Sequence, residues 1–126
     1  MKKIICLILF MQIPVACLAK RLYKEADYQN YWCRCHNGIT EYKNPDYTRV
    51  DCLTETHAVE FDFANKWAES IGQALHYQYL TGKKGKVVLI LENPQKEMCY
   101  YQRVKTLGQI HNFDTEYITP SIFLKH

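Results

Sequence analysis

Glycine and proline are scarce in this chain, which contains five and four of them among 126 residues. The sequence has no glycine-rich loop of the kind that cradles phosphates, and it has neither a nucleophile elbow nor a cysteine-protease signature. It also lacks internal repeats, low-complexity stretches and linkers. These absences exclude the common nucleotide-cradling and hydrolase motifs and favour one small domain.

The N-terminus has the pattern of a cleavable export signal. A short basic start precedes an apolar run over residues 4–16 and the small-residue exit Cys17-Leu18-Ala19, which predicts cleavage after Ala19. Gln12 and Pro14 interrupt the run, which falls short of the ~20 apolar residues that a spanning helix needs. We therefore expect a single domain over residues 20–126, periplasmic or secreted, with no stable membrane insertion.

An excess of charge of one sign is also missing. Loss of Lys2 and Lys3 would leave 14 of the 16 basic side chains against 13 acidic ones, a net charge of +1. Bulk charge therefore does not indicate a nucleic-acid partner, and phosphate binding would need a local patch. Lysines and one arginine late in the chain could form such a rim, or could simply be solvated: Lys83, Lys84, Lys86, Arg103 and Lys105.

Four cysteines lie beyond the signal, and in an exported chain they predict disulfides. They are Cys33, Cys35, Cys52 and Cys99, which allow three pairings. A bond from Cys52 to Cys33 or Cys35 would tie the first helix region to a strand, and such a bond adds ~2–4 kcal/mol to a small domain. The alternative is a zinc site that includes His36, although the CxC-H spacing is not a standard zinc signature.

Hydrophobic periodicity and turn residues predict a mixed sheet flanked by helices. The helices are expected over residues 23–31, 65–80 and 98–110. The strands are expected over residues 38–42, 48–54, 57–63, 86–91 and 116–118. The fold class is therefore α/β in the order α-β-β-β-α-β-α-β, and the unbroken aliphatic run of the 86–91 strand is typical of burial on both faces.

Acidic side chains converge in the predicted hairpin. If the turn lies at Glu55-Thr56, Asp51 faces Glu60 across the two strands, and Asp62 shares the face of Glu60. Acids that face one another need solvent or a cation, and oxygen ligands suit Mg²⁺ or Mn²⁺. The other interpretation is a wet hairpin face, in which these acids are simply exposed to solvent. The alternating apolar residues, Val59, Phe61 and Phe63, are expected in the core.

The following helix carries two neighbouring stripes. One is mostly polar and comprises Lys66, Ser70, Gln73 and Tyr77; the other is mostly apolar and comprises Trp67, Ile71, Ala74, Leu75 and Gln78. The polar stripe could be a solvated face. It also supplies a lysine beside the acids. Acids that hold a metal ion and a nearby lysine are the groups that metal-assisted phosphodiester hydrolysis requires.

At these residues the chain resembles the PD-(D/E)xK, or restriction-endonuclease-like, nuclease superfamily. The similarity covers roughly residues 23–92 and consists of the element order, Asp51 in RVDCLT, the acid in HAVEFDF and a helix with QALHY. It implies that Asp51 and Glu60 are catalytic metal ligands for Mg²⁺ or Mn²⁺. It also implies a DNA or RNA substrate contacted by Gln73 and Tyr77, and a homodimer is common among such nucleases.

The chain departs from the family pattern at one position. Asp62 stands where the family has lysine, and this residue would serve as a third metal ligand. Relatives relocate the lysine to the neighbouring helix, so the resemblance implies that Lys66 takes the catalytic role. The alternative is an inactive, disulfide-bonded binding or structural module of the same fold, in which Lys66 neutralises a surface acid.

Overall fold

Three α-helices and five strands follow one another along residues 20–124, which are the residues that the computed structural model describes. The elements are α1 (Glu25–Cys35), β1 (Ile39–Lys43), β2 (Arg49–Leu53), β3 (His57–Phe63), α2 (Trp67–Thr81), β4 (Lys84–Ile90), α3 (Pro94–His111) and β5 (Asp114–Ile118). The predicted α/β class and the order α-β-β-β-α-β-α-β are confirmed. The predicted export signal, residues 1–19, lies outside the described residues.

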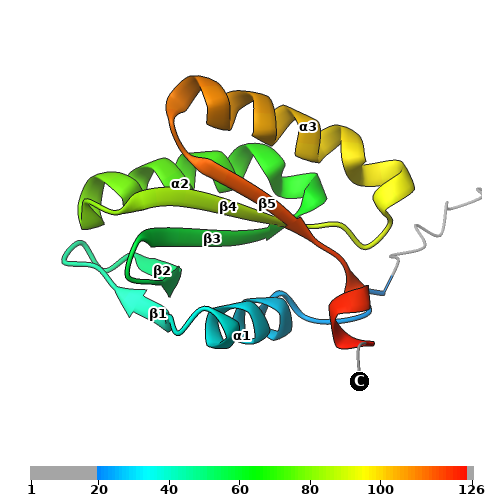
Figure 1. Ribbon diagram of the computed structural model, residues 1–126, viewed down its shortest axis with the longest axis horizontal. Coiled ribbons are helices and arrows are strands. Elements are labelled where there is room, and N and C mark those ends of the chain that lie inside the picture. Colours follow the sequence, from blue (N-terminus) through cyan, green and yellow to red (C-terminus); the bar gives the residue numbers. More distant parts are fainter. Residues whose placement is uncertain (1–19, 125–126) are drawn as a thin grey trace, which may run out of the picture.

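The strands form one mixed sheet in the order β1-β2-β3-β4-β5. Strands β1, β2 and β3 are joined by short turns and pair antiparallel, whereas β3, β4 and β5 pair parallel through the helical crossovers α2 and α3. Helices α2 and α3 lie over one face of the sheet and α1 lies over the other (Figure 1). The domain therefore has three layers, with β3 in the middle of the sheet.

The face below α1 is packed with large apolar side chains. Tyr28 and Trp32 of the helix meet Val59, Phe61 and Phe63 of β3, and all five are at most 8 % exposed. The prediction that these alternate residues of β3 lie in the core is confirmed. Burial of one such side chain contributes roughly 1.5–3 kcal/mol, so this layer holds α1 firmly on the sheet.

Strand β4 is buried on both faces, as its aliphatic run predicted. Val88 and Ile90 pack in the α1 layer, whereas Val87 and Leu89 pack in the layer below α2 and α3. Gly85 permits the close approach of this strand to α2, because an added Cβ would lie 2.8 Å from the carbonyl oxygen of Ala74.

Two helix boundaries differ from those predicted by more than two residues. Helix α1 continues to Cys35 instead of ending near residue 31, because its last turn packs Trp32 and Cys33 into the core. Helix α3 begins at Pro94 instead of residue 98, since the Asn93 side chain caps it and proline is favourable in the first turn.

No helix within residues 20–124 combines the length and apolarity needed to cross a membrane.

Candidate functional site

The β2–β3 hairpin has the register predicted from its turn. Cys52 pairs with Val59 and Leu53 with Ala58, a register that places Asp51 opposite Glu60. The Thr54 side-chain oxygen accepts a hydrogen bond from the backbone N–H of His57 at 2.9 Å, which closes the turn. The two acids therefore meet because strand side chains repeat every second residue and the turn fixes the pairing.

The ladder between β2 and β3 stops at this pair of acids. One carboxyl oxygen of Asp51 accepts the backbone N–H of Phe61 at 2.7 Å, in place of a backbone acceptor. Across the sheet from Asp51, Glu41 of β1 has a φ of 55°, which interrupts the regular pairing on that side as well. The Asp51 carboxyl group consequently lies where neighbouring strands begin to separate.

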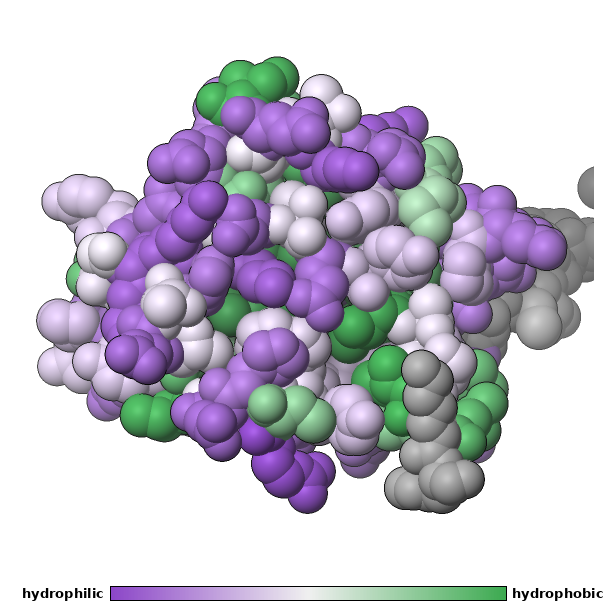
Figure 2. Space-filling model, viewed as in Figure 1, coloured by the Kyte–Doolittle hydropathy of each residue, from purple (hydrophilic) through white to green (hydrophobic). Residues whose placement is uncertain are grey.

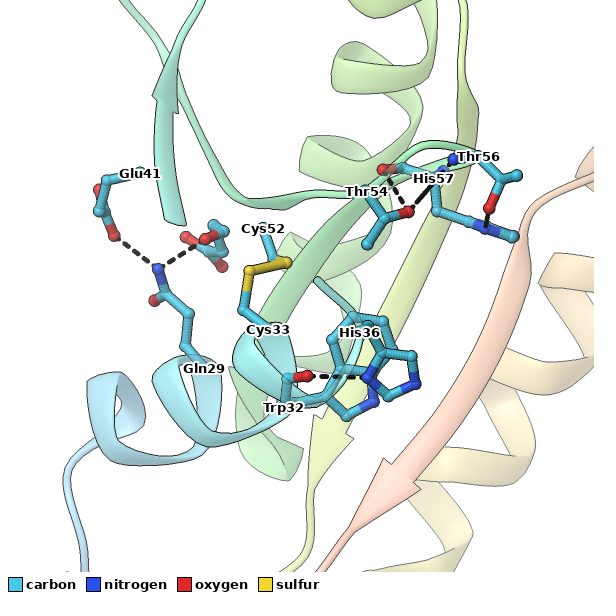
Figure 3. Close-up of a disulfide and its surroundings, with 10 residues drawn as sticks. Gln29, Trp32, Cys33, His36, Glu41, Cys52, Thr54, Thr56 and His57 are labelled. Atoms are coloured by element: carbon cyan, nitrogen blue, oxygen red, sulfur yellow. Dashed lines mark hydrogen bonds between the residues drawn. A yellow bond between two sulfur atoms is a disulfide. The ribbon is translucent and has the colours of Figure 1, made fainter. Parts of the chain in front are cut away.

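Helix α1 holds the backbone of Asp51 in place. The amide nitrogen of Gln29 donates to the Asp51 carbonyl oxygen at 2.7 Å and to the Glu41 carboxylate at 2.8 Å. One turn along the helix, Cys33 forms a disulfide with Cys52, the residue after Asp51 (Figure 3). The side chains of Gln29, Cys33 and Cys52 are buried, whereas that of Glu41 is exposed, so the strand carrying Asp51 is fixed from the α1 side of the sheet.

Helix α2 closes the other side of the pair. The Gln73 amide nitrogen donates to the carboxyl oxygens of Glu60, and Tyr77 packs one turn later against Val50 and Ala58. Ser70, of the same stripe, is fully buried. The prediction of two stripes on α2 is confirmed, but both face the sheet, and the interpretation of the polar stripe as a solvated face is wrong except at Lys66.

The acids themselves are buried. Glu60 and Asp62 are each 4 % exposed, so the interpretation of a wet hairpin face is wrong for them. Burial raises the pKa of Glu60 strongly, and repulsion from Asp51 adds to this effect. Burial also raises the pKa of Asp51, although the hydrogen bonds from Phe61 N–H and Glu60 counteract it. The pair therefore retains a proton at neutral pH when no cation is bound.

The site extends beyond the residues that the sequence indicated. Burial, followed by repulsion from Asp51, raises the pKa of Glu25 at the start of α1. Glu41 of β1 also raises the pKa of Asp51. No local pattern marks Glu25, Gln29 or Glu41, because each reaches the site only through the packing of α1 and β1 against β2.

Lys66 lies on the surface at the beginning of α2, on the Asp62 side of the site. Burial and repulsion from Glu25 raise the pKa of Asp62 to about 6, and the positive charge of Lys66 counteracts this shift. Lys66 likewise lowers the pKa of Glu25. Among the ion pairs of residues 20–124, none joins Lys66 to an acid within 4.0 Å, and none involves Asp51 or Glu60.

The cysteines are only partly as predicted. Cys33 and Cys52 form a disulfide, a bond that forms in an oxidising environment, but Cys35 and Cys99 are exposed free thiols. A second disulfide between them is excluded because α1 and α3 lie on opposite faces of the sheet (Figure 1). The zinc alternative is also wrong for Cys33 and Cys52, whose sulfurs are bonded to each other.

The lysines after α2 do not form a free phosphate rim. Lys84 pairs with Asp114 and Lys86 with Glu116, each at 2.7 Å. The Lys83 ammonium group donates to the carbonyl oxygens of Thr54 and Glu55. These contacts join the start of β4 to its neighbours, so the three lysines stabilise the fold and are not free to bind phosphate.

Within residues 20–124, no three or more His, Cys, Asp and Glu side chains are arranged as a ready metal site. Asp51 and Glu60 supply two oxygen ligands side by side, and their charges interact with those of Asp62, Glu25 and Glu41. This donor set fits a hard divalent cation in its chemistry, since acids that repel one another bind such ions. A third ligand requires a side-chain movement.

Comparisons with protein-family models, curated protein sequences and solved structures found no match for this chain. Membership in the PD-(D/E)xK superfamily therefore stays a prediction. Its support is the order of the elements and the positions of Asp51, Glu60, Gln73 and Tyr77.

Proposed function

We propose that this chain is an exported, metal-dependent nuclease of the PD-(D/E)xK type, acting in the periplasm or outside the cell. The observation that carries the proposal is the Asp51–Glu60 pair, in which Glu60 is buried and Asp51 half-buried, with Gln73 bonded to Glu60 where β2 and β3 separate. A structural role alone does not account for two acids in contact without a cationic partner, because their mutual repulsion and burial oppose folding.

Each residue of the site has a chemical role in this proposal. Asp51 and Glu60 would hold Mg²⁺ or Mn²⁺, and Asp62 would complete the ligand set. A bound ion of this kind supplies an activated water and a Lewis acid for phosphodiester hydrolysis. Gln73 orients the Glu60 carboxyl group through its hydrogen bond. Tyr77 shapes the floor of the site by packing against Val50 and Ala58.

Lys66 would stabilise the negative charge that develops on the phosphate in the transition state. Its position beside Asp62 supports this role, because it brings a mobile ammonium group to the edge of the acid cluster. Its exposure also lets it turn toward a bound phosphate. We assign the catalytic lysine of the family pattern to Lys66 on this basis.

A second candidate function is an inactive, disulfide-bonded binding or structural module. The observation that favours it is the same lysine, whose charge acts on Asp62 and Glu25 more than on Asp51 and Glu60. In this case the acid pair is left over from an ancestral active site and has no catalytic role, and the Cys33–Cys52 bond maintains the fold.

A cleavage assay separates the two candidates. The purified protein is incubated with single- and double-stranded DNA and RNA, with Mg²⁺, with Mn²⁺ and with EDTA. We expect metal-dependent cleavage that falls at least about 100-fold in Glu60→Gln and Lys66→Ala, the effect typical of losing a group that stabilises the transition state. The exposed residues Glu55 and Lys96 give matched controls, Glu55→Gln and Lys96→Ala, which should cleave normally.

Two results would exclude the nuclease proposal. The first is the absence of cleavage of all four substrates with either metal. The second is cleavage that persists unchanged in both Glu60→Gln and Lys66→Ala, which would indicate a contaminating enzyme. Loss of cleavage in Glu60→Gln alone would keep the metal site and remove Lys66 from the mechanism.

A further inference from the structure

The turn between β1 and β2 presents an aromatic ring that folding does not explain. Tyr47 is 76 % exposed and has a φ of 70°, a left-handed conformation that glycine adopts at lowest cost. Its backbone closes the turn by donating to the Asn44 carbonyl oxygen at 3.0 Å, a bond that any residue but proline could make. The ring contacts Lys43, whose ammonium nitrogen lies 4.6 Å from the ring centroid.

Two cations face each other just before this turn closes. Lys43 of β1 pairs directly with Arg49 of β2, and both side chains are exposed. Like charges placed opposite each other destabilise a sheet. Neither residue has an acidic ion-pair partner within residues 20–124. A lysine on an edge strand can protect against aggregation, but this explains neither a second cation directly opposite it nor the exposed Tyr47 ring.

The acid of the same turn does not neutralise this pair. Asp46 accepts the backbone N–H of Thr48 at 3.0 Å, and its other oxygen contacts the His76 ring of α2 at 2.7 Å. The hydrogen bond from the Thr48 hydroxyl, together with that from His76, lowers the pKa of Asp46. Its charge is thus held within the turn and against α2, which leaves Lys43 and Arg49 for an external anion.

The basic pair lies next to Asp51, one of the two candidate catalytic acids. Arg49 is two residues from Asp51 along β2, or about 7 Å, and Lys43 faces Arg49 across the strands. This distance is comparable with the separation of adjacent phosphates on a nucleic-acid strand. The surface around the hairpin, on the left in Figure 2, is mainly hydrophilic, as a site for a charged partner should be.

We propose that the β1–β2 hairpin binds single-stranded nucleic acid, with Lys43 and Arg49 on backbone phosphates and the Tyr47 ring stacked on a base. An exposed ring can stack only on a base that is free of a duplex, and such stacking tolerates any sequence. This inference rests on the proposed nuclease function, and it assigns that site an unpaired strand as its substrate class.

Binding is measured by fluorescence anisotropy with labelled oligonucleotides of about 12 nucleotides, a length within the usual site size of such proteins. Single-stranded DNA, single-stranded RNA and a DNA duplex are compared in EDTA, so that no cleavage occurs. We expect tighter binding of the single strands. Tyr47→Gly should weaken it about 5- to 150-fold, the loss of one stacked base. Tyr79→Ala, which removes an exposed tyrosine of α2, should bind normally.

The double variant Lys43→Ala, Arg49→Ala tests the phosphate contacts. It should reduce the slope of log Kd against log salt concentration by about 1.4, since each contact to a single strand contributes about 0.7. A control variant, Lys96→Ala, which removes an exposed lysine of α3, should keep the wild-type slope. Tyr47→Gly should unfold at the same or a higher urea concentration than the wild type, because glycine suits the left-handed turn position. Weaker binding would then not be a folding defect.

Three results would overturn this inference: no binding of either single strand, equal or tighter binding of the duplex, or wild-type binding by both hairpin variants. The binding test and the cleavage assay can give opposite results, so the docking site and the nuclease activity can be rejected independently. Cleavage with unaltered binding in the hairpin variants would reject the docking site and keep the nuclease. Hairpin-dependent binding without cleavage would keep the docking site and reject the nuclease.

Discussion

Replacement of Glu60 with glutamine should stabilise the protein at neutral pH when no divalent cation is present. The Glu60 carboxyl group is 4 % exposed, lies beside Asp51 and accepts hydrogen bonds from Gln73. A glutamine there has the shape of the protonated acid. Its carbonyl oxygen can accept from Gln73 and its amide nitrogen can donate to the Asp51 carboxylate, so no buried polar group loses its partner.

The size of the effect follows from the proton that Glu60 retains on folding. In the unfolded chain its pKa is the ordinary value of 4.5, so at pH 7 the folded state binds a proton that the unfolded state has released. The difference of about 2.5 pH units, at about 1.4 kcal/mol each, gives a cost of about 3 kcal/mol. Because the unfolded state binds fewer protons, wild-type stability falls as the pH rises above about 4.5. Glu60→Gln should lose most of this fall.

Urea unfolding at pH 4 and pH 7 in EDTA, without reductant, measures the effect. The two proteins should be nearly equal at pH 4, and Glu60→Gln should be more stable by up to about 3 kcal/mol at pH 7. Mn²⁺ should stabilise the wild type more than the variant. Glu55→Gln, an exposed control, should change neither. A destabilisation by Glu60→Gln that is larger at pH 7 than at pH 4 would refute the reasoning, since it would mean that the folded protein favours the ionised carboxylate.

Two further predictions concern the disulfide and the glycines. The double change Cys33→Ala, Cys52→Ala should lower the free energy of unfolding by about 3 kcal/mol, because the bond spans 19 residues; urea unfolding checks this, and an unchanged midpoint would contradict it. Gly38→Ala should destabilise by about 1–3 kcal/mol because its Cβ would collide with both disulfide sulfurs. Gly72→Ala, on the exposed side of α2 with open space around it, should stabilise by about 1 kcal/mol; the two thermal midpoints should therefore move in opposite directions.

The architecture was predictable where local chemistry leaves one solution. The turn at Glu55-Thr56 fixed the hairpin register, because a slip of one residue would have moved Phe61 out of the core below α1 and put Glu60 and Asp62 there instead. The aliphatic run that ends β4 has no polar face, so only a strand covered on both faces can bury its side chains. The hairpin turn alone placed Asp51 opposite Glu60, without any knowledge of the helices.

The boundaries that were wrong lie where one residue type has two structural uses. Pro94 comes soon after β4, which ends at Ile90, and it occupies the first turn of α3, because a proline at this place fits either a loop or a helix start. The extension of α1 to Cys35 depends on Trp32 and Cys33 reaching the sheet, and the local sequence does not contain that information. The acids Glu25 and Glu41 were missed for the same reason, since tertiary packing alone brings them to Asp51.

The position of Lys66 follows from the geometry of the strand before it. Successive residues on one face of a strand are about 7 Å apart, so a lysine that follows β3 directly comes closer to Asp62 than to Glu60. The positive charge of Lys66 accordingly counteracts the rise in the pKa of Asp62 and of Glu25. For Lys66 to act on a phosphate held at Asp51 and Glu60, its side chain must turn back over Asp62, which becomes easier if Asp62 has turned inward as a metal ligand.

The nuclease proposal therefore requires that Asp62→Asn and Lys66→Ala impair cleavage together, with a double variant little worse than either single variant. Two independent, additive losses would show that Lys66 does not work through that rearrangement.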